Sequence, residues 1–293
     1  MIVVRTIAEL RDVVRLARAR GDRIGLVPTM GALHDGHLSL LARARSHCPC
    51  VIVSLFVNPP QFNDAADLER YPRDEARDAA MLESADAHVL FAPTVHEVYP
   101  HGFMTTVELS ALAAPLEGAV RGTGHFRGVA TVVAKLLNMA QPDDAFFGQK
   151  DAQQALIITQ LVRDLDIPVQ VVICPTVREA DGLAMSSRNV LLDADSRKRA
   201  PTLHRALAAV EQAIVSGERD ASRALQHGEH ILDQAHIAVD YFVAVSPHTL
   251  QPIDRLHGRI LVAIAARFGA VRLIDNVLVS VDTPVAAPDG MAA

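Results

Sequence analysis

The sequence predicts an α/β protein in which a doubly wound parallel sheet is followed by a smaller α+β domain. Three apolar runs, Ile24–Thr29, Val51–Val57 and His88–Ala92, lack the polar alternation of half-exposed strands. This pattern indicates strands that are buried on both faces. Helix-period segments separate the runs, as helical crossovers between parallel strands require. The arrangement is Rossmann-like, and ligands are expected beyond the carboxyl ends of the strands.

The remaining elements of this first domain follow in order along the chain. Helices alternate with short apolar runs as far as Cys174, and each run is bounded by turn residues. We predict helices over Leu38–Ser46, Asp74–Ser84, Arg127–Met139 and Gln153–Leu165, and strands over Thr105–Leu109, Ala145–Phe147 and Val169–Cys174.

After Pro175 the pattern changes to two helices followed by three strands. The predicted helices are Asp195–Ser216 and Ser222–Ala235, and the predicted strands are Val239–Val245, Arg259–Ala265 and Val271–Val279. We therefore expect a Rossmann-like domain over residues 1–176 and a smaller α+β domain over 177–282. The Pro- and Ala-rich segment 283–293 is expected to be disordered.

The composition is that of a globular protein, with 50% hydrophobic and 21% charged residues. The formal net charge of −6 disfavours nucleic acid or an anionic membrane as the main partner. Three cysteines are too few for a disulfide framework and favour a reducing compartment. The N-terminus lacks the features of a signal peptide, and no apolar run could span a bilayer. We expect a soluble cytoplasmic protein.

The segment Pro28–His37 carries the first chemical motif, His-x-Gly-His, where a strand leads into a helix. Gly36 has no side chain, so a ligand can approach the backbone at the helix start. The free N–H groups and the helix dipole there favour an anion. His34 and His37 can lie on the same side of the turn and donate hydrogen bonds to phosphate oxygens. This pattern favours nucleotidyl transfer, although two surface histidines on a loop would have the same spacing.

Histidines and cysteines near this motif suggest a metal site as an alternative. However, the segment Cys48–Cys50 has one intervening residue instead of the two that are typical of a zinc knuckle. Cys50 also leads directly into a predicted buried strand. We therefore expect buried, inert thiols. The residues considered for this site are His34, His37, His47, Cys48 and Cys50.

The second motif, Phe147–Asp151, ends one strand and begins a helix. Lys150 places a positive charge at the ligand-binding edge and suits a phosphate. Asp151 can either cap the helix or bind ribose hydroxyls. Gln154, in the first helical turn, is expected to face the same crevice.

The third motif, Gly182–Asn189, contains Ser186, Ser187 and Arg188 in succession. Two hydroxyls and a guanidinium on a loop that begins with glycine can form a mobile clamp for an anion. The alternative is an ordinary Ser-rich helix start. The position of the loop at the predicted domain boundary favours the clamp.

Two further segments are candidate ligand sites. Gln61 follows the second strand in Val57–Phe62 and can hydrogen-bond a small polar substrate, although a Pro-rich turn would look the same. Gly122–Gly128 has the wrong spacing for a dinucleotide fingerprint, and no clear strand precedes it. The sequence contains no Walker A motif, so an ATP site must be of another type.

The complete set of motifs resembles the pantothenate synthetase (pantoate–β-alanine ligase) family. The segments VPTMGALHDGH, SLFVNPPQF, HFRGVATVVAKL, FGQKDAQQ and GLAMSSRN occur in the family's order, and RLIDN near the C-terminus is similar too. The resemblance covers nearly the whole chain except the tail. By itself, His-x-Gly-His marks only the wider nucleotidyltransferase superfamily, which includes class I aminoacyl-tRNA synthetases.

The resemblance implies a two-step reaction. The carboxylate of (R)-pantoate attacks the α-phosphate of ATP to give pantoyl adenylate and pyrophosphate. The amine of β-alanine then displaces AMP to give pantothenate. Family members require Mg²⁺ and are typically homodimers; the sequence does not identify the Mg²⁺ ligands.

The same resemblance implies that the domain over 1–176 binds the nucleotide and pantoate and that the domain over 177–282 acts as a lid. It also implies roles for individual residues. Those expected to bind ATP are Met30, Gly31, His34, His37, Gly148, Lys150, Asp151, Val177, Met185, Ser186, Ser187 and Arg188. Catalytic roles within this set fall to His34, His37, Lys150, Ser186, Ser187 and Arg188. Pantoate is expected to contact Met30, Asn58, Gln61 and Gln154, and β-alanine to contact Gln61.

Two other functions share parts of this pattern. A different His-x-Gly-His nucleotidyltransferase could act on a phosphorylated cofactor precursor. A non-catalytic nucleotide sensor or metal-binding module could use the His and Cys residues alone. Both are hypotheses alongside the ligase.

Overall fold

A computed structural model of the chain describes residues 1–281. The chain divides into two compact units between Val190 and Leu191, whereas the sequence predicted a boundary after residue 176. The lid function expected for the second part stays a prediction. The segment 283–293, expected to be disordered, lies outside the described residues.

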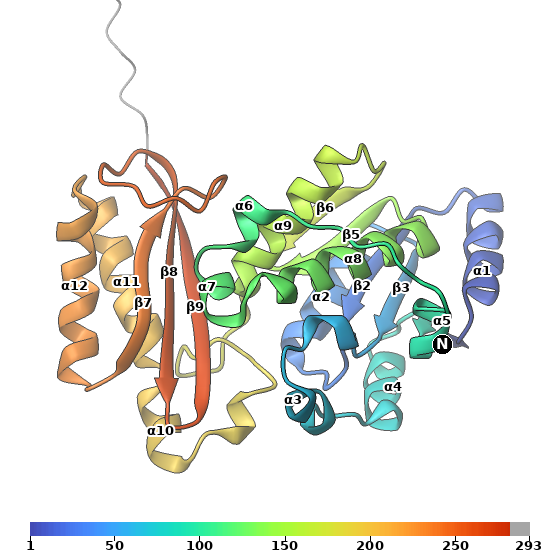
Figure 1. The fold of residues 1–293 in the computed structure, drawn as a ribbon, viewed down its shortest axis with the longest axis horizontal. Helices are drawn as coiled ribbons and strands as arrows, with labels where there is room; N and C mark the ends of the chain where they lie inside the picture. The colour runs from blue at the N-terminus through green and yellow to red at the C-terminus, as the bar shows by residue number, and fades with distance from the viewer. Residues whose placement is uncertain (282–293) are drawn as a thin grey trace, which may run out of the picture. The chain divides into compact units, whose positions relative to one another are not determined.

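The first unit is built on a six-stranded parallel sheet, which confirms the predicted fold class (Figure 1). The strand order is β1-β4-β3-β2-β5-β6. The strands are β1 (Ile2–Val4), β2 (Ile24–Thr29), β3 (Cys50–Leu55), β4 (Val89–Phe91), β5 (Asp144–Gly148) and β6 (Gln170–Cys174).

Helices cover both faces of this sheet, because successive strand residues point to opposite sides. In β2, Leu26 lies in the core cluster with helices α1 (Ile7–Ala19), α8 (Thr123–Ala140) and α9 (Ala152–Asp164). Its neighbour Val27 lies in the opposite cluster, with α2 (Asp35–Arg45) and α4 (Glu75–Ser84). The apolar runs in the sequence are therefore strands buried on both sides.

The strand order places a topological switch point between β2 and β5. The chain goes from β2 through β3 to β4 on one side and later adds β5 and β6 on the other. Ligands of doubly wound sheets bind beyond the carboxyl ends of the strands at such a point. Here the segments that begin at Met30 and Gln149 leave the sheet side by side, because β2 pairs with β5.

The strand predicted over Thr105–Leu109 is wrong. This segment has no strand structure, and the Val107 N–H donates to the Thr131 hydroxyl on α8 at 3.0 Å. Val107 and Leu109 pack against the core formed by that helix. Their apolar pattern therefore reflects a loop that crosses a helix, not a place in the sheet.

Several elements of the first unit were not assigned from the sequence. Strand β1 and helix α1 precede the first predicted strand, and Thr6 and Glu9 form a capping box at the start of α1. The other elements in this group are short: η1 (Pro59–Gln61), α3 (Ala65–Arg70), α5 (Val95–Val98), α6 (Ser110–Ala113), α7 (Glu117–Arg121) and η2 (Gln149–Asp151). The short helix η3 (Asn189–Leu191), also not assigned, includes the last residues of this unit and the first of the next.

The second unit packs two helices on a three-stranded antiparallel sheet. Helices α11 (Thr202–Val215) and α12 (Ala221–Gln234) contact the sheet formed by β7 (Ala238–Val245), β8 (Gly258–Phe268) and β9 (Val271–Val281). The single helix predicted over 195–216 is wrong. It is divided into α10 (Ala194–Arg199) and α11 at Pro201, which has no N–H to continue the helical ladder.

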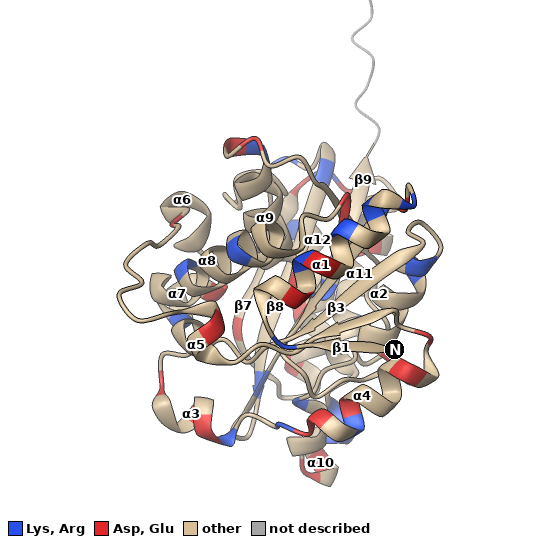
Figure 2. Cartoon of the chain, turned by 90° about the vertical axis from the view of Figure 1, so that its right-hand side faces the viewer, with Lys and Arg blue, Asp and Glu red and all other residues tan. Residues whose placement is uncertain are grey.

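Acidic and basic residues occur on the same helices, for example on α1 and α4 (Figure 2). The net charge of −6 is thus a small excess of acidic over basic residues, and both kinds occur on the same helices. Within residues 1–281, none of the helices combines the length and hydropathy needed to cross a bilayer.

Candidate active site

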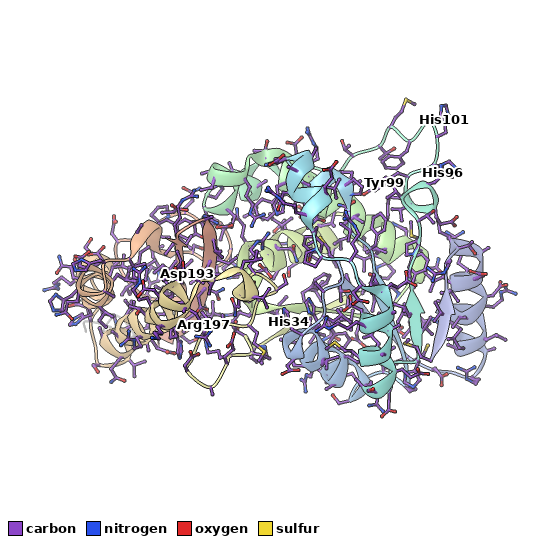
Figure 3. The ribbon with its side chains drawn as sticks, turned by 90° about the horizontal axis from the view of Figure 1, so that it is seen from below. His34, His96, Tyr99, His101, Asp193 and Arg197 are labelled. Carbon is purple, nitrogen blue, oxygen red and sulfur yellow. The ribbon has the colours of Figure 1, made fainter. Side chains whose placement is uncertain are left out.

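The His-x-Gly-His motif forms the first turn of α2 and caps it. His34 is the N-cap residue, and its Nδ1 accepts the Gly36 N–H at 3.1 Å. The His37 Nδ1 accepts the His34 N–H at 3.4 Å. The two rings are tilted against each other with centroids 4.1 Å apart. His34 is labelled in Figure 3. The expected placement of both rings on one side of the turn is confirmed.

Both imidazoles are neutral near pH 7. Burial, together with the neighbouring His34, lowers the pKa of His37 to about 3. Burial and the nearby Lys150 also lower the pKa of His34. Because each Nδ1 accepts a backbone hydrogen bond, we assign the remaining ring proton to Nε2. Each ring therefore offers one N–H donor beside the start of a helix.

Gly36 has a structural role that the sequence did not suggest; the expected approach of a ligand to its backbone stays a prediction. A Cβ at this position would lie 2.8 Å from Cε1 and Nδ1 of the His34 ring. The missing side chain makes room for the imidazole of His34, and the expected approach of a ligand to the backbone is not needed to explain the glycine. The same Cβ would lie 3.8 Å from Cβ of Met185, so the 182–189 loop lies close to this turn.

The loop before α2 is held by Asp78, a residue that sequence reasoning missed. The Asp78 carboxylate on α4 is 1% exposed and accepts the N–H groups of Ala32 and Leu33 at 2.8 and 2.9 Å. Gly31 has a φ of +83°, and a Cβ there would lie 3.0 Å from the same carboxylate. Asp78 lies in a helix with several other charged residues. Nothing in the sequence distinguishes it from a surface charge.

Lys150 and Asp151 lie where β5 ends. The Lys150 Nζ is 3.7 Å from the Asp151 Oδ1. Asp151 is at the N-cap position of α9, but its side chain makes no capping hydrogen bond there. The Asp151 side chain is about half exposed, and the cations of Lys150, Arg188 and Arg121 lower its pKa against the opposing effect of desolvation. The carboxylate is therefore ionised and available to a ligand, which favours the binding interpretation over capping.

The two glutamines that follow have different surroundings. Gln153 is buried; its amide donates to the carbonyls of Leu112 and Pro115 and accepts the Glu117 N–H. Its role is to hold the segment around α6 and α7. Gln154 lies in the first turn of α9 and is half-buried; its contact with a ligand stays a prediction.

The segment from Val177 to Asn189 forms a looped hairpin. The Met185 N–H donates to the Val177 carbonyl at 2.9 Å, and Arg178 forms a β-bridge with Ala184. The Asn189 amide closes the loop by donating to the Glu179 carboxylate at 2.7 Å. Val177 and Met185, both expected near the nucleotide, are thus neighbours.

Tyr71 joins this loop to the rest of the unit and was also missed. Burial raises the pKa of the Tyr71 hydroxyl, and Arg188 and Ser187 act against this rise, so the hydroxyl lies near the 186–188 segment. Its ring packs edge-on against Phe62 at a centroid distance of 5.5 Å. In the sequence Tyr71 precedes a proline in a polar stretch, which gave no indication of this contact.

Asn58, Gln61 and Met30 form a second cluster beside the first. The Asn58 amide donates to Oε1 of Gln61 at 3.0 Å, and the Gln61 amide nitrogen is 2.9 Å from the Met30 sulfur. Met30 belongs to the loop between β2 and α2, so it connects this amide cluster to the histidine turn.

The cysteines do not form a metal site with the histidines. The Cys48 thiol donates to the Asp144 carboxylate at 3.2 Å, and burial raises its pKa to about 12. Cys50 and Cys174 are also buried, with raised pKa values. The part of the chain that the structure describes holds no group of three or more His, Cys, Asp or Glu residues that could bind a metal ion.

Comparison with known proteins shows the family of the whole chain. The family model described as pantoate-β-alanine ligase matches residues 2–278. A pantothenate synthetase from Chloroflexus aggregans is 52% identical over 278 residues, which cover 94% of this chain and 99% of the relative. The enzyme of that name from Cereibacter sphaeroides is 52% identical over 275 residues, with coverages of 94% and 98%.

Solved structures of the same kind share the fold. A pantothenate synthetase from Thermus thermophilus matches with a TM-score of 0.89 at 48% identity, covering 94% of this chain and 99% of that chain. A pantoate-β-alanine ligase from Francisella tularensis, complexed with β-γ ATP and β-alanine, matches with a TM-score of 0.77 at 36% identity. The match covers 95% of this chain and 97% of that chain.

Proposed function

Because this chain belongs to the pantoate-β-alanine ligase family, we propose that its reaction proceeds at the histidine turn through a pantoyl adenylate. ATP is the energy source, and pantoate and β-alanine are the substrates that are joined. The family match favours the ligase over a different nucleotidyltransferase or a non-catalytic sensor.

The observation that carries the proposal is the pair of neutral imidazoles at the switch point. Two Nε2–H donors at a helix start offer hydrogen bonds to an anion together with the positive end of the helix dipole. The charge effects on His34 and Asp151 indicate that Lys150 and Arg188 lie near the same turn. A polyanion such as a triphosphate would find donors and cations there without an ionised histidine.

In the first step, a pantoate carboxylate oxygen bonds to the α-phosphorus of ATP. The bond from that phosphorus to the oxygen bridging to the β-phosphate breaks, and pyrophosphate leaves with the electron pair. His37 and His34 would hydrogen-bond phosphate oxygens as charge shifts towards the leaving group. Lys150 would neutralise negative charge on the phosphates. The β- and γ-phosphates would be held by Ser186, Ser187 and Arg188.

The remaining nucleotide contacts are assigned to residues at the same strand ends. Gly31, Gly148 and the Met30 backbone would line the nucleotide, and Asp151 would accept ribose hydroxyls. Val177 would lie by the adenine, with Met185 beside it. The hydrogen bond between Met185 and the Val177 carbonyl supports placing these two together.

In the second step, the β-alanine amine bonds to the acyl carbon of the adenylate. The acyl–oxygen bond breaks, AMP leaves with the electron pair, and the amine releases a proton. Gln61 would contact both pantoate and β-alanine, while Gln154, Met30 and Asn58 complete the pantoate site. Holding both small reactants in line can supply up to about 7–11 kcal/mol of the barrier reduction in favourable cases.

We propose that Mg²⁺ enters this reaction as part of the nucleotide substrate. The described residues provide no cluster of metal ligands, and Mg²⁺ commonly binds phosphate oxygens and water with few protein ligands. A homodimer and a cytoplasmic location are proposed from the family and the cysteine usage. Light scattering of the purified chain tests the first of these.

The experiment is pantoate-dependent exchange of labelled pyrophosphate into ATP without β-alanine. The proposal predicts exchange that requires both pantoate and Mg²⁺, and an adenylate that can be isolated with the protein. Exchange driven by a phosphomonoester and not by pantoate would favour another nucleotidyltransferase. Tightly bound zinc without turnover would favour a metal-binding module.

A further inference from the structure

The amide of Asn58 has only one orientation that satisfies its neighbours. Asn58 is 1% exposed, and its Nδ2 lies 3.1 Å from the carbonyl oxygen of Gly128 on α8. A carbonyl can only accept, so the NH₂ group of Asn58 must face Gly128. The second hydrogen of that group points to Oε1 of Gln61 at 3.0 Å.

The orientation of Asn58 fixes that of Gln61. Because Oε1 of Gln61 accepts from Asn58, its NH₂ group faces the other way, where the Met30 sulfur lies 2.9 Å from Nε2. A thioether is a weak acceptor, so these N–H groups remain available to a stronger one. Gln61 is half-buried and therefore presents donors, not an acceptor, to whatever binds beside Met30.

The remaining polar atom of Asn58 is occupied by a tyrosine. The Tyr99 hydroxyl donates to Oδ1 of Asn58 at 2.7 Å. Tyr99 follows α5 and packs between Phe56 and Phe103, with ring centroids 6.2 and 5.1 Å away. In Figure 3 His101 lies at the outer tip of this segment, and Tyr99 lies nearer the sheet. Burial raises the pKa of Tyr99 to about 12, so its hydroxyl keeps its proton.

The backbone around Gln61 is fixed as well. A Cβ on Gly128 would lie 2.6 Å from backbone atoms of Pro60 and Gln61, so only glycine lets η1 lie this close to α8. The Gln61 carbonyl oxygen accepts a hydrogen bond from Nδ1 of His125 at 2.7 Å. Main chain and side chain of Gln61 are thus held separately.

We propose that Tyr99 is a positioning residue for pantoate: through Asn58 it keeps the NH₂ group of Gln61 turned towards the substrate. The inference rests on the proposed contact between Gln61 and pantoate. It adds that the pantoate atom bound by Gln61 is an acceptor, a carboxylate or hydroxyl oxygen. Without the Tyr99 hydroxyl, Oδ1 of Asn58 is left buried and without that partner, so the Asn58 side chain is held less firmly and its hydrogen bond to Gln61 weakens.

The test compares Tyr99→Phe, Gln61→Ala and the double variant in pantoate-dependent pyrophosphate exchange. Tyr99→Phe keeps the ring packing and should raise the apparent KM for pantoate about three- to tenfold, with the KM for ATP within about twofold of the parent. In the Gln61→Ala background, Tyr99→Phe should change the pantoate KM by less than about twofold, because it acts through Gln61. Tyr241→Phe in the second unit is the matched control.

The possible outcomes separate the two claims. If Gln61→Ala leaves the pantoate KM unchanged, the proposed pantoate site is wrong, and the role of Tyr99 is wrong with it. If Gln61→Ala raises the KM but Tyr99→Phe does not, only the positioning role is overturned. Equal effects of Tyr99→Phe with and without Gln61 would mean that the hydroxyl supports the fold in general, which also overturns it.

A further variant tests the donor directly. Gln61→Glu keeps the acceptor for Asn58 but offers pantoate a carboxylate. The KM for pantoate should rise more than about tenfold at about pH 8 and recover partly as the pH is lowered and the side chain becomes protonated. If Gln61→Glu leaves the KM for pantoate unchanged at about pH 8 and also at the lower pH, Gln61 does not donate to the substrate.

Discussion

At the scale of single residues, His34 and His37 combine a structural and a chemical role. Their Nδ1 atoms cap the backbone of α2, and this use of Nδ1 leaves Nε2–H as the donor for a ligand. The capping contacts also hold the rings at a centroid distance of 4.1 Å. A histidine that caps its own helix needs no further side chain to set its tautomer.

Replacing His37 with alanine should abolish most adenylation while the fold is retained. The lost Nε2–H donor should lower the rate of pantoate-dependent exchange by about 10²–10³-fold, as removal of a transition-state donor does elsewhere. Exchange rates measured beside His47→Ala, an exposed histidine after the same helix, provide the comparison. Near-parental exchange in His37→Ala would remove His37 from the mechanism.

The low pKa of His37 predicts a specific dependence of stability on pH. In the unfolded chain this imidazole takes up a proton near pH 6.5, whereas the folded protein resists protonation down to about pH 3. Between these values the unfolded state binds more protons, so the free energy of unfolding falls as the pH is lowered below 6.5. One such group contributes a slope of at most about 1.4 kcal/mol per pH unit.

Urea unfolding of the parent and of His37→Gln between about pH 7.5 and about pH 5 measures this contribution. Glutamine keeps polarity without titrating in this range. The difference in unfolding free energy between the two proteins should be constant above about pH 7 and shift in favour of His37→Gln as the pH falls. A difference that does not vary with pH would mean that His37 takes up a proton as readily in the folded protein as in the unfolded chain, with no lowered pKa.

At the scale of elements, close contacts between backbones position the amide cluster. Turn η1 lies against α8 at Gly128, and the loop before α2 is held to α4 by Asp78. The amphipathic pattern of α8 predicts the helix but not which turn lies against it. Spacing in the sequence identifies helices and strands, and the contacts that aim side chains come from residues far apart in the chain.

Gly128→Ala tests the first of these contacts. The added Cβ would meet Pro60 and Gln61 backbone at 2.6 Å and push η1 away from the helix. We expect about 1–3 kcal/mol of lost stability from overpacking and a raised KM for pantoate. Gly124→Ala, on the same helix with its nearest contacts at 3.8 Å, is the control and should leave both quantities near parental values. Equal effects in the two variants would contradict the account of η1.

The predicted and missed elements differ in a physical way. Strand β2 has the bounds that its apolar run predicted, because burial on both faces leaves a continuous signal. Pro201 was present in the predicted helix 195–216, and its effect on the ladder outweighed the apolar periodicity. Thr105–Leu109 has strand-like residues but packs on α8. Local pattern does not distinguish a strand from a buried loop.

The site shows the same division. Residues that belong to compact motifs, such as His34, His37 and Lys150, could be named from the sequence. Residues that act on those motifs from another element, such as Asp78 and Tyr99, could not. Nothing in their own neighbourhood in the sequence differs from a surface acid or a core aromatic. Their partners lie 41 to 46 positions away along the chain.

At the scale of the whole molecule, the order of strands brings the chemistry together. Strand β2 pairs with β3 on one side, and the chain later returns to add β5 on the other side of β2. The histidine turn after β2 and Lys150 after β5 therefore meet at one sheet edge, as the switch-point rule predicts. Within the first unit, the 182–189 loop approaches the same turn through Met185. The central claim is that this edge holds the triphosphate.

The most direct test is a crystal structure of the chain with a non-hydrolysable ATP analogue, Mg²⁺ and pantoate. The account predicts phosphate oxygens within hydrogen-bonding distance, about 2.7–3.2 Å, of Nε2 of His34 and His37. Lys150 should contact the same triphosphate, and the Gln61 amide nitrogen should face a pantoate oxygen. A nucleotide bound with its triphosphate away from the two imidazoles would contradict the account.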